Sequence, residues 1–511
     1  MTDSAGDGPV RRRGRPSAEL VDATPLGGSA VDVAVRIGWL LKMARVADPA
    51  GVARQQRDMV ERLADIGIRT SVSSLSRLEA GQRVSNELLE GYETVLSLRP
   101  GTLRGPIDAL LRTHGGAPIE RRSPTPPTLE EWSTAYRRIR VAEPQGIDWL
   151  HFADMMAAPG MLGLPADLAA PRIERLAREL CRSVGVAHLL RYEALAQLRC
   201  SPYHDLVLEV VRQLVDDPAT QVLYDLMAVL AERPTDALLS WCGALLSREL
   251  PHVVRGGVIA IESMRQNGGA LDWRLIEDPF VEAFNGGEPW RHQLLSHAFR
   301  VLPPRIRAEV LPRLDHPVGQ VRQPMDWTPS RRNLHYTFCQ ELAREITQRL
   351  DLDQQPILAR LLFEAIYDFR ETRRGNAIFF LAALPFPDVL ADAMVKASTS
   401  EDAPTREGAV LAIAGISHPV YVDTARAWVR TEEQTLRTAG LMVLAHAADH
   451  IVPDRMRQLV QQPYPVGRLA MYAVGMCGDP LVVDLALDPE VPDEVRRAAR
   501  WWLANGSRVT R

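Results

Sequence analysis

A repeated helical pattern near the C-terminus is the feature that most limits what this chain can fold into. Five segments begin with an arginine, continue with a stretch rich in Ala, Leu and Val, and then reach a small or helix-breaking residue; they start at Arg374, Arg406, Arg437, Arg468 and Arg496. Successive starts lie 32, 31, 31 and 28 residues apart. A shorter amphipathic segment, such as residues 421–430, lies between them. A period near 30 residues with two helices per unit predicts an α-solenoid, in which each unit buries its apolar face against the next.

The last unit suggests the type of repeat. Its segment VRRAARWWL, residues 495–503, resembles the second helix of HEAT-type repeats, in which a Val-Arg pair leads into small and large apolar positions. We therefore expect HEAT-like helical repeats over residues 371–511. Residues 254–261 (VRGGVIAI) fit a more divergent unit that would extend the array towards residue 250. The β-branched side chains of residues 253–261 also suit a strand, but the helical context favours a helix.

The rest of the chain predicts an all-α protein with several parts. Residues 1–30 are rich in Gly, Ser, Asp, Arg and Pro, and a disordered tail is expected there. Residues 31–112 form a compact helical domain, and residues 113–128, with two glycines and four prolines, form a linker. Residues 129–370 are read as an α-helical middle region of amphipathic segments.

Four helical patterns follow one another in the N-terminal domain. They cover residues 36–45, 57–68, 71–80 and 86–98. Val60, Leu63 and Ala64 are expected to face inward from the second helix, which ends near Gly67. Ser71 is expected to cap the third helix, and Gly81 to end it.

The third helix has the composition of a DNA-reading helix. Its expected buried stripe consists of Val72, Leu75 and Leu78. The side chains left outside are Ser73, Ser74, Ser76 and Arg77. Small hydroxyl side chains allow a helix to approach a major groove closely, and they bond to phosphates or base edges. This face predicts contact with double-stranded DNA.

The end of this helix adds a motif. Leu75-Ser76-Arg77-Leu78-Glu79-Ala80-Gly81 follows the pattern apolar, Ser, any, apolar, Glu, any, Gly. Residues 35–98 thereby resemble the helix-turn-helix domain of the Cro/C1 type, also called the xenobiotic-response-element (XRE) family. The connections at residues 46–56 and 67–70 are longer than is usual in that family.

The resemblance implies a role for each residue of the third helix. Ser71 would cap the helix, Val72, Ser73 and Arg77 would face base edges, and Ser74 and Ser76 would lie nearer phosphates. Glu79 would hold the end of the helix, and Arg83 would add a DNA contact. Such proteins usually bind as homodimers to paired half-sites about one DNA turn apart.

The N-terminal tail offers a second DNA contact. Arg11-Arg12-Arg13-Gly14-Arg15-Pro16 contains Arg-Gly-Arg-Pro, which resembles the core of the AT-hook. Arg13 and Arg15 would then enter a narrow minor groove, whose negative potential attracts arginine. The alternative is a solvated basic tail that makes nonspecific phosphate contacts.

The charge balance and the positions of the cysteines limit the classes of function that fit this chain. The chain has 60 basic and 64 acidic residues, so it is not coated in positive charge, and any DNA binding must be local. All the basic residues are arginine except Lys42 and Lys396, which makes chance arginine clusters common. The five cysteines form no CxxC pair, and neither a secretory signal nor a membrane-spanning run is present; both observations favour a cytoplasmic protein.

No enzymatic chemistry is expected. The sequence lacks metalloprotease, P-loop, nucleophile-elbow and dinucleotide motifs, so no cofactor is predicted. His446 and His450 could share a helical face, but no third metal ligand accompanies them. The sequence favours a sequence-specific transcriptional regulator whose helical region serves for oligomerisation, partner binding or sensing of a small-molecule effector. The alternative is an α-solenoid protein-interaction scaffold whose N-terminal bundle does not read DNA.

Overall fold

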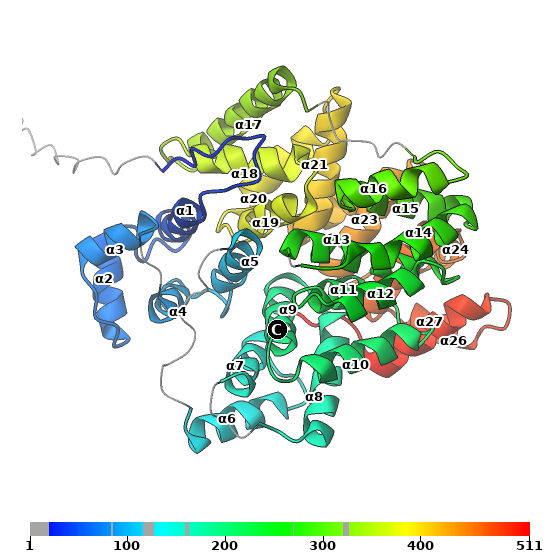
Figure 1. Ribbon diagram of the computed structural model, residues 1–511. Helices are drawn as coiled ribbons and strands as arrows, with labels where there is room; N and C mark the ends of the chain where they lie inside the picture. Colours follow the sequence, from blue (N-terminus) through cyan, green and yellow to red (C-terminus); the bar gives the residue numbers. More distant parts are fainter. Residues whose placement is uncertain (1–19, 83–84, 116–126, 159–162, 269, 320–326) are drawn as a thin grey trace, which may run out of the picture.

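The computed structural model describes residues 20–82, 85–115, 127–158, 163–268, 270–319 and 327–511. Within these ranges the chain is all-α, as predicted, and its β-structure is limited to an isolated bridge between Ser183 and Val509. The helices form an N-terminal bundle (α1–α5), a middle array (α6–α16) and a C-terminal array (α17–α27), shown in Figure 1. In the described part of the chain, no helix is both long enough and apolar enough to cross a lipid bilayer.

The bounds of the helices are as follows. The N-terminal bundle contains α1 (Val33–Val46), α2 (Gln56–Asp65), α3 (Val72–Glu79), α4 (Asn86–Val95) and α5 (Arg104–His114). The middle array contains α6 (Leu129–Ile139), α7 (Gly146–Met156), α8 (Ala166–Leu180), α9 (Gly185–Arg199), α10 (His204–Asp216), α11 (Tyr224–Leu230), α12 (Asp236–Leu245), α13 (Pro251–Asn267), η1 (Trp273–Ile276), α14 (Glu277–Asn285), α15 (Pro289–Val301), α16 (Pro304–Val310) and η2 (Leu311–Arg313). The C-terminal array contains α17 (Pro329–Arg349), α18 (Pro356–Tyr367), α19 (Glu371–Ala382), α20 (Pro387–Ala397), α21 (Ala403–Ile416), η3 (Pro419–Tyr421), α22 (Val422–Arg430), α23 (Gln434–Ala447), α24 (Pro453–Leu459), α25 (Val466–Cys477), α26 (Leu481–Leu487) and α27 (Asp493–Asn505).

The C-terminal array repeats as the sequence predicts. The odd-numbered helices α19 to α27 contain the five arginine-led segments, and each packs on the next, while a shorter helix packs beside it. The leading arginine has a structural role in three units. Arg406 donates to the carbonyl of Ser400 (2.8 Å), and Arg437 donates to that of Thr431 (2.7 Å). Arg496 makes the equivalent bond to the turn before α27. In these units the repeated arginine ties its helix to the preceding turn.

The middle array follows the same two-layer plan. Helices α7, α9, α11, α13 and α15 pack in succession, and α8, α10, α12 and α14 pack beside them. The segment at residues 253–261 lies inside α13, so the helical interpretation is confirmed. The solenoid-like arrangement therefore begins well before residue 250.

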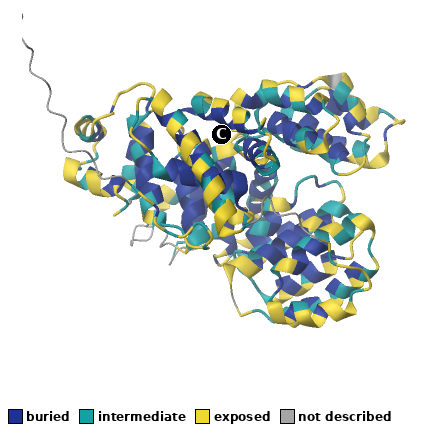
Figure 2. Cartoon of the chain, turned by 90° about the horizontal axis from the view of Figure 1, so that it is seen from above, coloured by how far each residue is buried: buried dark blue, intermediate teal, exposed yellow. Residues whose placement is uncertain are grey.

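The end of the C-terminal array packs against the middle array. Arg178 of α8 donates to the side-chain oxygen of Asn505 in α27 (3.2 Å), and the N–H of Val184 donates to the carbonyl of Val509 (3.1 Å). Figure 1 accordingly shows the C-terminus beside α9. Figure 2 shows buried residues running through the interior of each group of helices, with exposed residues on the outside.

Residues 20–30 differ from the predicted tail. The sequence predicts disorder over residues 1–30, but residues 20–30 form an irregular strap that packs on the C-terminal array. Asp22 is buried (6% exposed) because its carboxylate binds Arg36 (2.8 Å), and Arg360 donates to the carbonyl of Asp22 (3.0 Å). The polar composition of this segment does not reveal its order, because buried ion pairs hold the strap together with only two packed leucines, Leu20 and Leu26.

Candidate nucleic-acid interface

The candidate interface is the short helix α3 in the N-terminal bundle. The hydroxyl of Ser71 accepts a hydrogen bond from the N–H of Ser74 (3.1 Å), which caps the helix as predicted. Gly81 adopts a φ of +79°, and the N–H of Gln82 bonds back to the carbonyl of Arg77 (2.9 Å). This is the hydrogen-bond pattern of a glycine-ended helix, so both predicted ends of α3 are confirmed.

The outer face of α3 carries most of the predicted contact residues. Its exposed residues include Ser71, Val72, Ser73, Ser76 and Arg77. Ser74 is half-buried and receives a hydrogen bond from the hydroxyl of Ser71 (3.0 Å). Leu75 and Leu78 are buried, as predicted.

Two side chains predicted to face inward are exposed. Val72 is 45% exposed, because it lies in the first turn of α3, before the part of the helix that carries the buried Leu75 and Leu78. Ala64 is exposed because Met59 and Leu63, four residues apart, form the buried stripe of α2 and place Ala64 beside it. Val72 therefore belongs to the outer face of α3 and not to its core.

Glu79, at the end of α3, joins four helices. Its carboxylate accepts two hydrogen bonds from Arg45 of α1 (2.5 and 2.7 Å). Gln56 of α2 donates to it (2.9 Å), as does the hydroxyl of Tyr92 of α4 (2.9 Å). Burial and the negative charge of Glu79 raise the pKa of Tyr92 well above its ordinary value, so this hydroxyl stays a donor. The structural role that the resemblance implies for Glu79 agrees with these contacts.

Two glycines fix the angle between α1 and α3. A Cβ atom on Gly38 would lie 2.5 Å from the carbonyl oxygen of Glu79 and 2.5 Å from the nitrogen of Gly81. A Cβ atom on Gly81 would lie 2.1 Å from the carbonyl oxygen of Ala34. The two backbones therefore touch directly, and only glycine allows this approach.

The two long connections are folded segments. In the first, the Asp48 carboxylate accepts hydrogen bonds from the N–H groups of Ala50 (3.3 Å) and Val52 (3.0 Å). In the second, Gly67 has a φ of +88° and ends α2, as predicted. Thus the greater lengths do not loosen the placement of α3.

Further exposed arginines lie on α2 and on the connections on either side of it. Arg54, Arg62 and Arg69 are exposed and form no ion pair within the described residues, whereas Arg57 pairs with Glu61 (3.0 Å). These arginines place exposed positive charge on and beside α2, which also carries the acidic residues Asp58, Glu61 and Asp65. Three other predicted contact residues, Arg13, Arg15 and Arg83, lie outside the described residues.

The N-terminal bundle is fixed to the C-terminal array. Nearly every side of α1 is buried, since one face packs on α3 and another meets α18. The indole N–H of Trp39, itself 1% exposed, donates to the side-chain oxygen of Gln355, just before α18 (2.9 Å). In Figure 1, α2 and α3 lie on the side of α1 away from α18, which leaves the outer face of α3 open.

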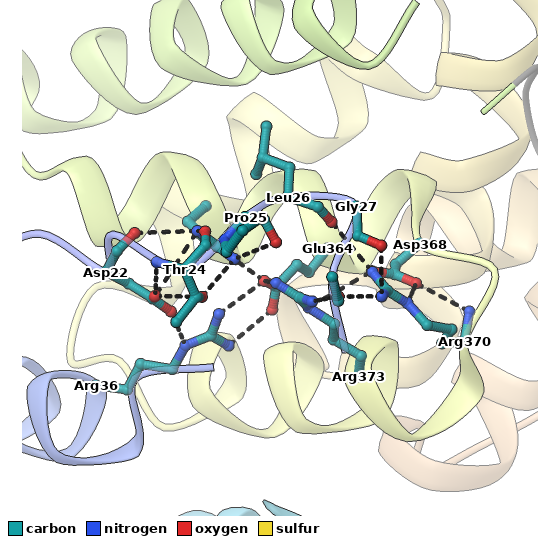
Figure 3. Close-up of polar contacts among 12 residues, drawn as sticks. Asp22, Thr24, Pro25, Leu26, Gly27, Arg36, Glu364, Asp368, Arg370 and Arg373 are labelled. Carbon is teal, nitrogen blue, oxygen red and sulfur yellow. Dashed lines mark hydrogen bonds and ion pairs between the residues drawn. The ribbon is translucent and has the colours of Figure 1, made fainter. Parts of the chain in front are cut away.

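A buried charged cluster forms the centre of this contact (Figure 3). This junction cluster consists of Asp22, Arg36, Arg360, Glu364, Asp368, Arg370 and Arg373. Glu364 forms ion pairs with Arg36 of α1, Arg360 of its own helix and Arg373 of α19, with nitrogen–oxygen distances of 2.7 to 3.1 Å. Burial would raise the pKa of Glu364, but Arg36 and Arg373 outweigh it and lower the pKa to about 2.

The other candidate residues do not form a site. His446 bonds the hydroxyl of Tyr472 (3.0 Å), and burial lowers the pKa of His446 to about 4. Among the described residues, no three His, Cys, Asp or Glu side chains are placed to hold a metal ion.

Comparison with known proteins adds little about function. No protein-family model matches the chain, and no curated protein matches it. An engineered protein is 13% identical, with 73% of this chain and 98% of that chain covered and a TM-score of 0.22. Kap121p is 13% identical, with 92% and 53% covered and a TM-score of 0.27. A structure of microtubule polymerases with tumor overexpressed gene (TOG) domain arrays is 10% identical, with 81% and 100% covered and a TM-score of 0.26.

This chain therefore spans about half the length of Kap121p. Similarities at this level carry no argument about function. The all-α, HEAT-like arrangement rests on the helix packing described above.

Proposed function

We propose that this protein is a sequence-specific DNA-binding transcriptional regulator of the Cro/C1 type. The outer face of α3 carries the proposal: Ser73, Ser76 and Arg77 are exposed on a short helix whose opposite side is anchored by Leu75 and Glu79. A helix with this face fits a major groove, with the guanidinium of Arg77 positioned for a guanine edge and the serines for phosphates or bases. The function is non-enzymatic.

The few exposed cations predict a weak affinity of each single bundle for DNA. The free cations near α3 are few, so one bundle neutralises few phosphates and its binding is weak at physiological salt. A homodimer on two half-sites would raise the affinity by linking two binding events. Because α1 is held by α18, the array sets the orientation of α3 and with it the spacing of the half-sites.

The test uses the full-length chain, because a fragment of the N-terminal bundle would expose Trp39 and Arg36. Preferred sequences are selected from random double-stranded DNA, and their affinity is measured for wild type and for Ser73→Ala/Arg77→Ala. We expect about a 10- to 100-fold loss of specific affinity and a relaxed sequence preference. A matched control, Arg430→Ala, removes an exposed arginine from α22 and should leave binding unchanged. Binding without sequence preference that survives the double substitution would contradict the proposal.

A second candidate is a protein-interaction scaffold, which the helical architecture favours more directly than it favours DNA binding. Apolar side chains are exposed on the last two helices of the array, where Val483 is 45%, Leu487 76% and Leu503 51% exposed. A scaffold would keep a protein partner in the Ser73→Ala/Arg77→Ala variant and lose it in Leu487→Asp. A DNA-binding regulator should instead lose DNA binding in Ser73→Ala/Arg77→Ala and keep it in Leu487→Asp.

A further inference from the structure

Where the end of the C-terminal array contacts the middle array, the surface contains a groove of about 500 Å³. Its walls come from the end of α6, one face of α8 and the end of α27. The charged residues of the lining are Arg140, Glu174, Arg175, Arg178, Glu179 and Arg182. Four guanidinium groups thus face two carboxylates, so the groove has a surplus of positive charge.

Two of these arginines are committed to the fold. Arg175 bonds Glu179 (2.8 Å) and the carbonyl oxygens of Val141 (3.0 Å) and Ala142 (2.7 Å). Arg178 bonds Glu174 (2.9 Å) and, across the groove, the side-chain oxygen of Asn505 (3.2 Å). The two carboxylates of the lining therefore already have arginine partners.

The other two arginines have no acidic partner in the described part of the chain. Arg182 donates only to backbone carbonyls, those of Ser507 (2.7 Å) and Arg178 (3.4 Å). Burial lowers the pKa of Arg182, and the nearby charge of Glu179 offsets this effect only in part. Arg140, at the end of α6, is exposed and lies over the ring of Tyr136 (5.9 Å) without an ion pair.

We propose that this groove binds a small polyanion that carries two or more phosphate or carboxylate groups. One acidic group pairs with Arg140, and another pairs with Arg182. The planar fork of a guanidinium matches the oxygens of either group and forms two parallel hydrogen bonds. A volume of about 500 Å³ lies in the range of metabolite pockets and is too small for a duplex. This site does not depend on whether α3 reads DNA.

The bound anion would connect the two arrays. Arg140 and Arg182 belong to the middle array, whereas Ala504 and Asn505 form the opposite wall, and Arg182 donates to the carbonyl of Ser507 just beyond it. The segment after Ser507 continues to Thr510, whose carbonyl accepts a hydrogen bond from Arg99, between α4 and α5 (3.5 Å). A ligand in the groove therefore stabilises the closure of the arrays next to the N-terminal bundle.

The test is a titration of the full-length protein with inorganic pyrophosphate at constant ionic strength, followed by calorimetry and thermal unfolding. We expect saturable binding and a raised unfolding temperature in wild type. Arg140→Gln/Arg182→Gln should abolish both effects, whereas the control Arg265→Gln/Arg430→Gln, which removes equal charge from exposed positions, should retain them. Binding that persists in the first variant, or no binding in wild type beyond that of a matched sodium chloride series, overturns the proposal.

Two further measurements make the result specific. Arg140→Gln alone should change the stability of the fold little, because this exposed side chain forms no ion pair in the described ranges and only lies over the ring of Tyr136; it should weaken pyrophosphate binding about tenfold. The affinities of orthophosphate, citrate and adenosine triphosphate are then measured. Orthophosphate carries one acidic group and the other two carry several, while citrate carries carboxylates in place of phosphates. Tighter binding of the ligands with several groups supports the proposal, while orthophosphate binding as tightly as pyrophosphate contradicts a polyanion site.

Discussion

Arg36 of α1 and Glu364 of α18 lie 328 residues apart in the chain and form a two-pronged ion pair, with both nitrogen–oxygen distances at 2.7 Å. Both side chains are almost fully buried, at 1% and 0% exposure. The pair therefore joins the candidate DNA-binding bundle to the C-terminal array without contact with solvent. Such a contact makes the position of α3 a property of the whole molecule, not of a flexible head.

The first prediction concerns the loss of this carboxylate. Glu364→Gln leaves Arg36, Arg360 and Arg373 buried without their shared counter-charge, and breaking a buried ion pair in this way costs about 3–5 kcal/mol. Urea denaturation should show this loss as a lower midpoint. Glu341→Gln, at an exposed position on α17, should change stability by no more than about 0.5 kcal/mol. Equal midpoints for the two variants would refute the importance of the pair.

The second prediction concerns pH. Arg36 and Arg373 lower the pKa of Glu364 to about 2 against the opposing effect of burial, from an ordinary value near 4.5. A carboxylate of lowered pKa stabilises the fold above its unfolded pKa, and this contribution is lost as pH falls from about 4.5 towards 2. The stability gap between wild type and Glu364→Gln should thus be constant from pH 7 to 5 and shrink between pH 4.5 and 3. Denaturant midpoints of both proteins across this pH range measure the difference in stability. A difference that grows as the pH falls would contradict a lowered pKa for Glu364.

The local features of the N-terminal bundle were predictable because they depend on neighbours in sequence. Ser71 and Gly81 mark the ends of α3 through hydrogen bonds within a few residues. The apolar spacing of Leu75 and Leu78 likewise fixes which side of the helix is buried. The repeated arginines gave the period of the C-terminal array for the same reason, since Arg437 bonds a turn only six residues away.

The junction cluster could not be predicted, because its pairs are distant in sequence and almost every cation in the chain is arginine. Nothing near Arg36 distinguishes it from an exposed arginine such as Arg57. Asp22 lies in a segment whose composition indicates disorder, although its partners bury it. Long-range charge pairing of this kind leaves no periodic signal. It also explains why α1, with partners on two faces, lacks the single apolar stripe of a surface helix.

The third prediction tests the close approach of α1 and α3. Gly38→Ala would place a Cβ atom 2.5 Å from two backbone atoms, so the helices must separate. We expect a loss of about 1–3 kcal/mol, as for overpacked core positions, together with weaker DNA binding if α3 is the reading helix. Gly375→Ala in α19 is the matched control, because a Cβ atom there meets nothing within 4 Å. Removing a helical glycine should stabilise that variant by up to about 1 kcal/mol. Opposite signs for the two substitutions are the expected result, and a neutral Gly38→Ala would argue against the approach.

The last prediction tests the arginine that opens each repeat. Arg437 is 7% exposed and donates two hydrogen bonds to the carbonyl of Thr431 (3.1 and 2.7 Å) and a third to Gln462 (3.2 Å). Arg437→Gln leaves that carbonyl without its charged donor, and we expect a loss of about 1.5–3 kcal/mol. Arg430→Gln, seven residues earlier on an exposed position, should change stability by less than about 0.5 kcal/mol. In Arg437→Gln, amide hydrogen exchange should become faster in α22 and α23. A repeat array unfolds first at the unit that has lost its stabilising contact with the preceding turn. Uniform exchange across the array would instead mean that the C-terminal array unfolds as one body, and that the arginine does not act on its own repeat.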